Sequence, residues 1–218
     1  MTLSDEDATR ANFYGLLAHL FYASPDRALL EALADDGLLD TDGSALADAW
    51  QALVEAAAVT DCDTERAAYD KAFVDTDRAR VTLYTRAYLP RYANEALLGA
   101  LRADLAALGL SRREASREPE DHIAALCEAM RHLIATQNLG LAQQMRFFNR
   151  WIDPVAEPLC DAILRPRCSV FYEHVGRFAK AFFELERSAF EMFDAGTQQV
   201  KPASNAPPKS TVRSLTND

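Results

Sequence analysis

The spacing of apolar residues constrains this chain more than any other feature of its sequence. Apolar side chains recur at the three- and four-residue intervals of an α-helix through almost all of residues 4–195, whereas the two-residue alternation of a β-strand is almost absent. A helix-capping signal at Ser4 to Asp7 begins the first such segment. Its apolar face then comprises Phe13, Leu16, Leu17, Leu20 and Phe21. The pattern predicts an all-α protein.

Proline, glycine and polar breaks divide this pattern into about nine to ten helices, with Gly109 at the expected end of one and Pro119 at the expected start of the next. The predicted helices lie roughly at 5–23, 25–33, 46–57, 64–73, 83–89, 94–108, 119–134, 139–151, 154–165 and 171–189. The last of them carries a seam expected to pack against other helices, formed by Phe171, Val175, Phe178, Phe182, Leu185 and Ala189.

Residues 1–196 are predicted to form one helical bundle, because no internal repeat recurs at the roughly 33 to 45 residue periods of solenoid proteins. The composition changes after Gly196. Residues 197–218 hold Pro202, Pro207 and Pro208 with several Ser, Thr and Asn, and few apolar side chains. Such a segment buries too little apolar surface to order itself, so we expect a disordered C-terminal tail.

The formal net charge of -10 disfavours nucleic acid and anionic membrane surfaces as partners, and it suits a partner that carries positive charge. No apolar run approaches the roughly 18 residues that a membrane span needs, so no membrane insertion is expected. The acidic segment Met1 to Arg10 does not resemble a signal peptide, which favours a cytoplasmic protein. The four cysteines lack a CxxC spacing and are expected as thiols, with Cys127 as a small core residue.

Motifs of catalysis are missing from the sequence. It contains no G-x-S-x-G, no Gly-rich phosphate loop and no dinucleotide fingerprint, so we expect no enzyme of those classes. A metal-dependent helical enzyme is the rival hypothesis, because Glu118/His122 and Glu128/His132 are four residues apart and such pairs share a helix face. However, Glu118 precedes Pro119 and should lie outside the helix. We therefore expect a capping carboxylate and a solvated ion pair in place of a metal site.

The segment from Glu118 to His122 is the most informative stretch. Its proline and its acidic residues suit the first turn of a helix. They do not account for His122, whose cationic form the helix dipole disfavours. A neutral imidazole offers one donor and one acceptor, and Asp121 offers acceptors. These two side chains can bind the backbone amides of an incoming peptide or tie down the preceding connector, and physical chemistry alone favours neither.

Two aromatic stretches complete the candidates. Leu83 to Leu89 carries Tyr84 and Tyr88, which suit a binding surface and a bundle edge equally well. In the second stretch, the adjacent aromatics Phe147 and Phe148 point in different directions, so one of them could leave the core. We favour Phe148 and Trp151 packing inward and Phe147 packing against a neighbouring helix, because these helices bury wide faces.

These three stretches, in this order, resemble the TorD/DmsD/NarJ family of redox enzyme maturation chaperones. The family's Glu-Pro-x-Asp-His segment stands intact at 118–122. Upstream, 83–89 keeps both aromatics but has Thr85 and Arg86 where the family usually has Gly-Ser. Downstream, 147–155 keeps the two phenylalanines and Pro154 but lacks the family's histidine and tryptophan. The resemblance covers roughly residues 10–195.

The resemblance implies a TorD-like fold and a cytoplasmic chaperone of a molybdenum enzyme. Its partner would be the apo-molybdoenzyme catalytic subunit, held by its twin-arginine leader peptide during insertion of the molybdenum cofactor and then released for Tat export. Some members instead handle subunits without a cleaved leader, and the branch that looks closest accompanies formate dehydrogenases. No tightly bound cofactor is implied, although transient contact with the molybdopterin cofactor or with GTP is compatible with the family. The connector 109–118 becomes a candidate hinge, for a monomer or a domain-swapped dimer.

The same resemblance implies which residues bind the peptide. The bulky cation Arg86 puts the usual shape of the site in question, since small residues there normally allow close approach. The alternative is a helical scaffold that binds a folded subunit without reading a leader. The peptide-binding residues that the resemblance implies are Glu118, Pro119, Asp121, His122, Tyr84, Arg86 and Tyr88.

Overall fold

The computed structural model describes residues 3–35, 43–74, 81–89, 94–111, 118–136, 140–165 and 168–199. Throughout these ranges the regular structure is helical, which confirms the predicted all-α class. The predicted disordered tail lies outside the described residues from position 200 onward, and so does most of the candidate hinge 109–118. The last helix continues to Gln199, three residues beyond the predicted end of the bundle.

The helix boundaries follow local sequence signals. The side chains of Ser4, Ser44 and Asp61 each accept a hydrogen bond from a backbone N–H three residues later, which satisfies the first turn of three helices. A π-helical turn, η1 (Asp70–Val74), and a 3₁₀ turn, η2 (Thr85–Tyr88), interrupt the α-helices. The α-helices of the described part are α1 (Asp5–Tyr22), α2 (Arg27–Asp35), α3 (Ala45–Val59), α4 (Cys62–Tyr69), α5 (Asn94–Ala107), α6 (Ile123–Ala135), α7 (Leu141–Trp151), α8 (Asp153–Leu164) and α9 (Val170–Gln199).

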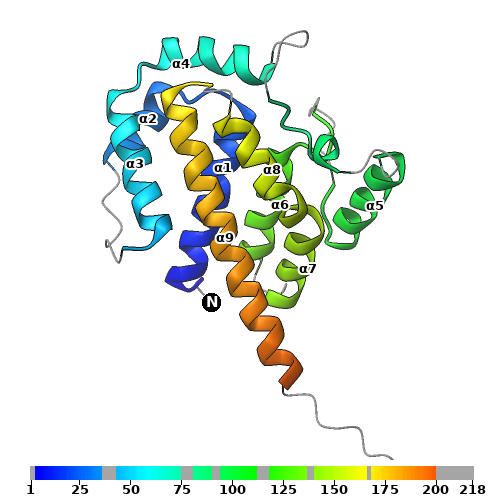
Figure 1. The fold of residues 1–218 in the computed structure, drawn as a ribbon. Helices are drawn as coiled ribbons and strands as arrows, with labels where there is room; N and C mark the ends of the chain where they lie inside the picture. Colours follow the sequence, from blue (N-terminus) through cyan, green and yellow to red (C-terminus); the bar gives the residue numbers. More distant parts are fainter. Residues whose placement is uncertain are drawn as a thin grey trace, which may run out of the picture.

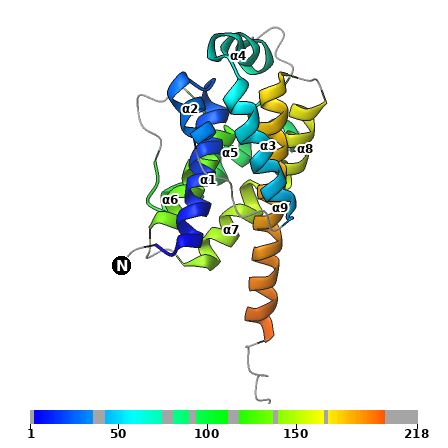
Figure 2. The same ribbon diagram turned by 90° about the vertical axis from the view of Figure 1, so that its left-hand side faces the viewer.

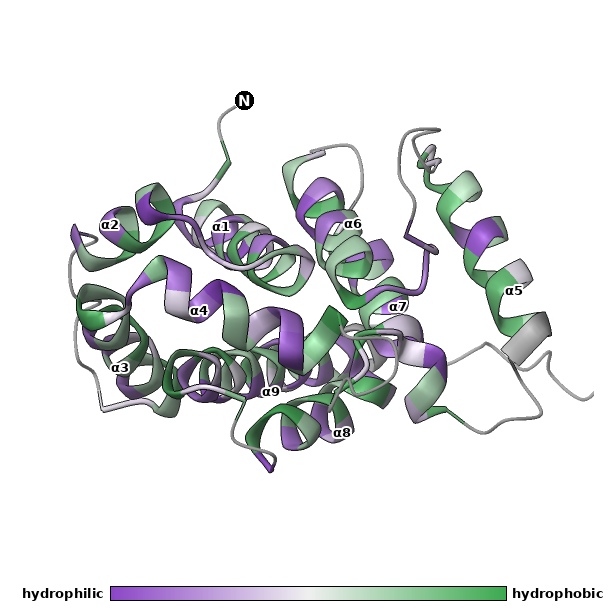
Figure 3. Cartoon of the chain, turned by 90° about the horizontal axis from the view of Figure 1, so that it is seen from above, coloured by the Kyte–Doolittle hydropathy of each residue, from purple (hydrophilic) through white to green (hydrophobic). Residues whose placement is uncertain are grey.

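The helices form two packed layers. Helix α1 packs against α6 in one layer, and α9 lies between α3 and α8 in the other (Figures 1 and 3). Aromatic rings join the layers: Phe13 of α1 lies 5.1 Å from both Trp50 of α3 and Phe178 of α9, measured between ring centroids. Figure 2 shows that the C-terminal part of α9 extends beyond the other helices.

The seam predicted for α9 is wrong in its second half. Leu185 is 51% exposed and Ala189 is also exposed, whereas Phe183, Glu186 and Phe190 are buried. The predicted seam repeats every 3.5 residues, but a straight α-helix has 3.6 residues per turn and drifts by about 20° per heptad from such a repeat. Over the length of α9 this drift moves the buried face to the neighbouring side chains.

Helix α5 stands at the edge of the molecule (Figures 1 and 3). The Asp104 carboxylate holds it to α7 by accepting hydrogen bonds from the Trp151 indole N–H at 2.8 Å and from Arg150. Its end at Gly109 was predicted correctly: this residue has a positive φ of 74°, and the next N–H reaches back to the Leu105 carbonyl at 2.8 Å.

Core positions predicted from the sequence are largely confirmed. Phe147, Phe148 and Trp151 are buried, and Cys127 is fully buried as a small core residue. The four cysteines form no disulfide with one another. Within the described ranges, every helix is too short or too polar to cross a membrane.

Candidate functional site

A short backbone ladder joins two of the predicted stretches. Tyr84 and His122 form an isolated antiparallel bridge. The Thr85 N–H donates to the Asp121 carbonyl, and the Ile123 N–H donates to the Leu83 carbonyl, both at 2.9 Å. This ladder places the tyrosine-containing segment directly beside the 118–122 turn, although the two are far apart in the sequence.

The ladder also corrects the predicted start of α6. Pro119 was expected in the first helical turn, but the helix begins only at Ile123 and His122 is its N-cap. Pairing with the neighbouring segment requires extended backbone at His122, with φ -68° and ψ 131°, so helical geometry cannot begin earlier. Residues 119–122 instead form a turn closed by a hydrogen bond from the His122 N–H to the Pro119 carbonyl at 3.1 Å.

The His122 side chain caps the helix in its neutral form. Its Nδ1 accepts a hydrogen bond from the Ala124 N–H at 3.2 Å, so the proton of the neutral ring is on Nε2. Burial lowers the pKa of His122, and this effect outweighs the nearby carboxylates of Glu118 and Asp121, which raise it. The ring also meets the Tyr84 ring edge to face, with 5.3 Å between centroids.

The lowered pKa of His122 predicts a loss of stability in acid. Below the ordinary value of 6.5, the unfolded chain takes up a proton at this residue that the folded chain does not, so the free energy of unfolding falls as the pH drops through that range. The measurement is urea unfolding of the wild type and of His122→Asn between about pH 7.5 and about pH 5.5. Asparagine also caps helices but does not titrate. Parallel pH dependence in both proteins would contradict the prediction.

Asp121 is fully buried beneath Arg86. Its Oδ2 accepts the backbone N–H of Arg86 at 3.3 Å and lies 3.5 Å from Nε of the same residue. The Arg86 guanidinium in turn lies over the Tyr84 ring, 5.1 Å from its centroid. The other carboxylate oxygen, Oδ1, is buried without a hydrogen-bond partner among the described residues.

The hydroxyl groups of Tyr84 and Tyr88 donate hydrogen bonds to different partners. The Tyr84 hydroxyl donates to the Glu118 carboxylate, and this hydrogen bond, with burial and the charge of Glu118, raises the pKa of Tyr84 to about 12. Tyr84 therefore remains a neutral donor near neutral pH. Tyr88 instead donates to the Thr82 carbonyl at 2.7 Å and lies on the side of η2 that packs against α8.

A groove of about 960 Å³ runs between α1 and α6. Of the seven residues implied by the resemblance, Glu118, Pro119 and His122 line it, whereas the Asp121 and Arg86 cluster lies outside it beyond Tyr84. The remaining walls come mainly from α1, the rest of α6 and the end of α5. They include Asn12, Gly15, Ala18, His19, Tyr22, Leu105, Leu110, Glu120, Ala125, Glu128, Ala129, Arg131 and His132.

The α1 wall was missed by sequence reasoning. Gly15, Ala18 and Tyr22 follow one another at helical spacing, and a side chain at Gly15 would meet the Arg131 side chain at 3.1 Å. Tyr22 is 61% exposed. The available signal in the sequence was a row of small residues that ends in an aromatic residue. Such a row is also common on ordinary helix surfaces, and the sequence does not show which helix packs beside it.

The two pairs considered for a metal lie on the groove without forming a centre. Glu128 makes an exposed ion pair with Arg131, as expected, and Nε2 of His132 lies 3.2 Å from the Thr136 hydroxyl. Glu118 lies outside the helix, also as expected, and its carboxylate accepts from Tyr84. In the parts of the chain that the structure describes, no three His, Cys, Asp or Glu side chains gather as metal ligands.

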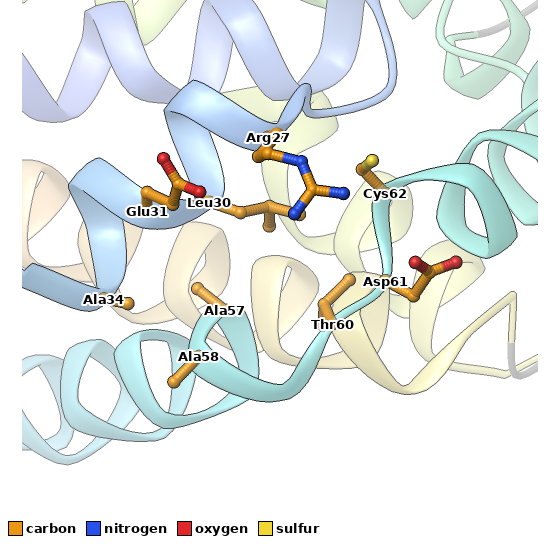
Figure 4. A pocket seen from close by; sticks show the side chains of 9 residues that line it. All are labelled: Arg27, Leu30, Glu31, Ala34, Ala57, Ala58, Thr60, Asp61 and Cys62. Carbon is orange, nitrogen blue, oxygen red and sulfur yellow. The ribbon is translucent and has the colours of Figure 1, made fainter.

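A second hollow of about 210 Å³ lies between α2 and α3 (Figure 4). Arg27, Glu31, Asp61 and Cys62 surround it with several alanines. It is below the roughly 300 Å³ at which drug-sized ligand sites begin, so the groove is the candidate binding site.

A protein-family model described as nitrate reductase delta subunit matches residues 39–161, more than half of the chain. The chain belongs to the nitrate reductase delta subunit family. This family consists of molybdoenzyme assembly chaperones and not of catalytic enzymes. No curated protein is significantly similar in sequence to this delta-subunit family member. The matched segment contains the 118–122 turn and the α6 wall of the groove, whereas the α1 wall lies outside it.

Proposed function

We propose that this protein is a cytoplasmic chaperone that binds the N-terminal leader of an apo-molybdoenzyme catalytic subunit while the molybdenum cofactor is inserted. The leader would lie in the groove between α1 and α6 and would be released for export afterwards. The observation that carries the proposal is the groove itself, which reaches the 118–122 turn. Its volume of about 960 Å³ is near the upper end of ordinary ligand sites, roughly 300–1,000 Å³.

The groove suits an apolar helix. Tyr22, Leu105 and Leu110 line it together with the small side chains of Ala18, Ala125 and Ala129. An amphipathic helix binds such a groove by burying its apolar face against the walls, and small residues allow its backbone to approach closely. The groove therefore fits the apolar segment of a leader peptide.

The charges of the groove favour one orientation of the leader. Glu118 lies in the turn that precedes α6, and its carboxylate accepts a hydrogen bond from the Tyr84 hydroxyl. Arg131 lies eight residues beyond Ile123 along α6, about 12 Å at 1.5 Å per residue, and there it pairs with Glu128 of the same wall. A leader with a basic end would therefore place that end near Glu118, and the net charge of -10 would attract it from solution.

A bulky side chain in the groove should block binding. Ala125 lies on the groove and is exposed, so Ala125→Trp fills the groove without disturbing the core. We expect it to weaken the binding of a synthetic twin-arginine peptide with an apolar helical segment by about tenfold or more, or about 1.4 kcal/mol, measured by titration calorimetry. Ala32→Trp, at an exposed position of α2 that does not line the groove, is the matched control and should leave the affinity unchanged.

Equal affinities of the wild type and Ala125→Trp would overturn the groove as the leader site. Thermal unfolding provides a second readout, because a ligand that binds only the folded state raises the Tm. If the folded catalytic subunit raises the Tm and the peptide does not, the protein is a scaffold for the subunit and not a leader-binding chaperone.

A further inference from the structure

Arg86 covers the one fully buried carboxylate of the described 118–122 turn. The Asp121 side chain is 0% exposed and the Arg86 side chain is 33% exposed, so the guanidinium lies between the carboxylate and solvent. A buried carboxylate is unfavourable without a cation or hydrogen bonds to compensate its charge. Arg86 supplies the cation from within the chain.

The position of this guanidinium is specified by three contacts. The backbone N–H of Arg86 donates to Asp121 Oδ2, which fixes the start of the side chain next to the carboxylate. Its Nε lies 3.5 Å from the same oxygen, and its Cζ lies 5.1 Å from the centroid of the Tyr84 ring. A carboxylate and an aromatic face are both surfaces that proteins commonly use to bind a guanidinium.

We propose that Arg86 is a resident cation that occupies a guanidinium site on Asp121 and thereby denies this site to an arginine of the client. The inference rests on the proposed function, in which a leader lies in the adjacent groove. Tyr84 lies between the groove and the Asp121–Arg86 pair. Its hydroxyl contacts Glu118 on the groove, and the Arg86 guanidinium lies over its ring face. The protein then selects its client mainly through the apolar groove, with little requirement for a particular arginine.

The Asp121 carboxylate can accept more hydrogen bonds than it receives from Arg86. Its Oδ1 is buried without a partner among the described residues, and the contact from Arg86 reaches only Oδ2. A guanidinium not tethered at Arg86 is able to make the bidentate pair that carboxylates favour. Removal of the Arg86 side chain should therefore create a cation site with a preference for guanidinium over other groups.

The first test uses methylguanidinium as a probe that is independent of any client. In Arg86→Ala, millimolar methylguanidinium chloride should raise the Tm relative to the same concentration of methylammonium chloride, and the wild type should show no such difference. Arg86→Gln serves as the second variant if the alanine variant does not fold, since its shorter side chain also vacates the guanidinium position. Equal Tm values in both salts for the variant would overturn the inference.

The second test measures which arginines matter in a client. Two synthetic peptides share one apolar helical segment, preceded by Arg-Arg in the first and Gln-Gln in the second. The wild type should bind both within about threefold, and Arg86→Ala should increase the preference for Arg-Arg about tenfold, or about 1.4 kcal/mol. Arg86→Ala/Asp121→Asn should lose that gain. Arg165→Ala removes an exposed cation that pairs with Asp161 of α8, and neither residue lines the groove, so as a matched control it should keep the wild-type ratio.

The outcomes separate this inference from the proposed function. Binding of both peptides with a ratio unchanged by Arg86→Ala would overturn the role of Arg86 and leave the groove as the leader site. Failure of both peptides to bind all of these proteins would overturn the proposed function and the role of Arg86 together.

Discussion

Replacing Glu186 by alanine is expected to lower the free energy of unfolding by about 3–5 kcal/mol, the range for removal of one partner from a buried ion pair. Glu186 of α9 is 2% exposed. Its carboxylate accepts hydrogen bonds from Arg10 at 2.7 and 3.0 Å and from the buried Tyr14 hydroxyl at 2.9 Å. Alanine would leave the buried Tyr14 hydroxyl without its acceptor, and it would leave Arg10 with only its exposed partner Asp7.

This effect is measured by urea unfolding at neutral pH. Glu184→Ala is the matched control, because Glu184 is an exposed glutamate on the same helix and its removal should change stability by no more than about 0.5 kcal/mol. Glu186→Gln should fall between the two, since the amide oxygen still accepts a hydrogen bond but the charge is lost. Similar unfolding free energies for the two alanine variants would show that the carboxylate does not hold α1 to α9.

Replacing Phe178 by alanine is expected to reduce stability by about 3–5 kcal/mol through loss of buried area and creation of a cavity. Phe178 is fully buried where α1, α3 and α9 meet. Its ring lies 5.1 Å from that of Phe13, 5.3 Å from that of Trp50 and 6.2 Å from that of Phe182, between centroids. These rings pack three helices at one point, so the space that alanine leaves cannot close without moving a helix.

The control for Phe178 is a second apolar residue of the same helix. Leu185→Ala should change the free energy of unfolding by no more than about 0.5 kcal/mol, because Leu185 is 51% exposed. Its effect also tests the corrected register of α9, since a large loss at Leu185 would support the seam predicted from the sequence. Phe178 packs against Phe13 of α1 but does not itself line the groove. Phe178→Ala should therefore weaken peptide binding only at temperatures where the variant begins to unfold and the α1 wall is lost.

Part of the candidate site could be predicted from the sequence, and part depended on contacts that the sequence does not show. The 118–122 segment was recognisable from its residues, and the neutral state of His122 followed from its place near a helix start. The first turn of α6 was misplaced, because the ladder that keeps His122 extended depends on a segment more than thirty residues away, with Leu83 accepting from Ile123. Local propensity carries no information about such a partner.

By itself, the sequence determined the all-helical class, the approximate helix positions, the C-cap at Gly109 and the family features of the 118–122 segment. These properties depend on neighbours along the chain, through the helical period and the capping residues. Only the tertiary structure decided that α1 and α6 enclose a groove, that Asp121 lies under Arg86 while Glu118 and His122 reach the groove, and which face of α9 is buried. Each of these depends on side chains that meet across long sequence separations, and their meeting is set by the packing of whole helices.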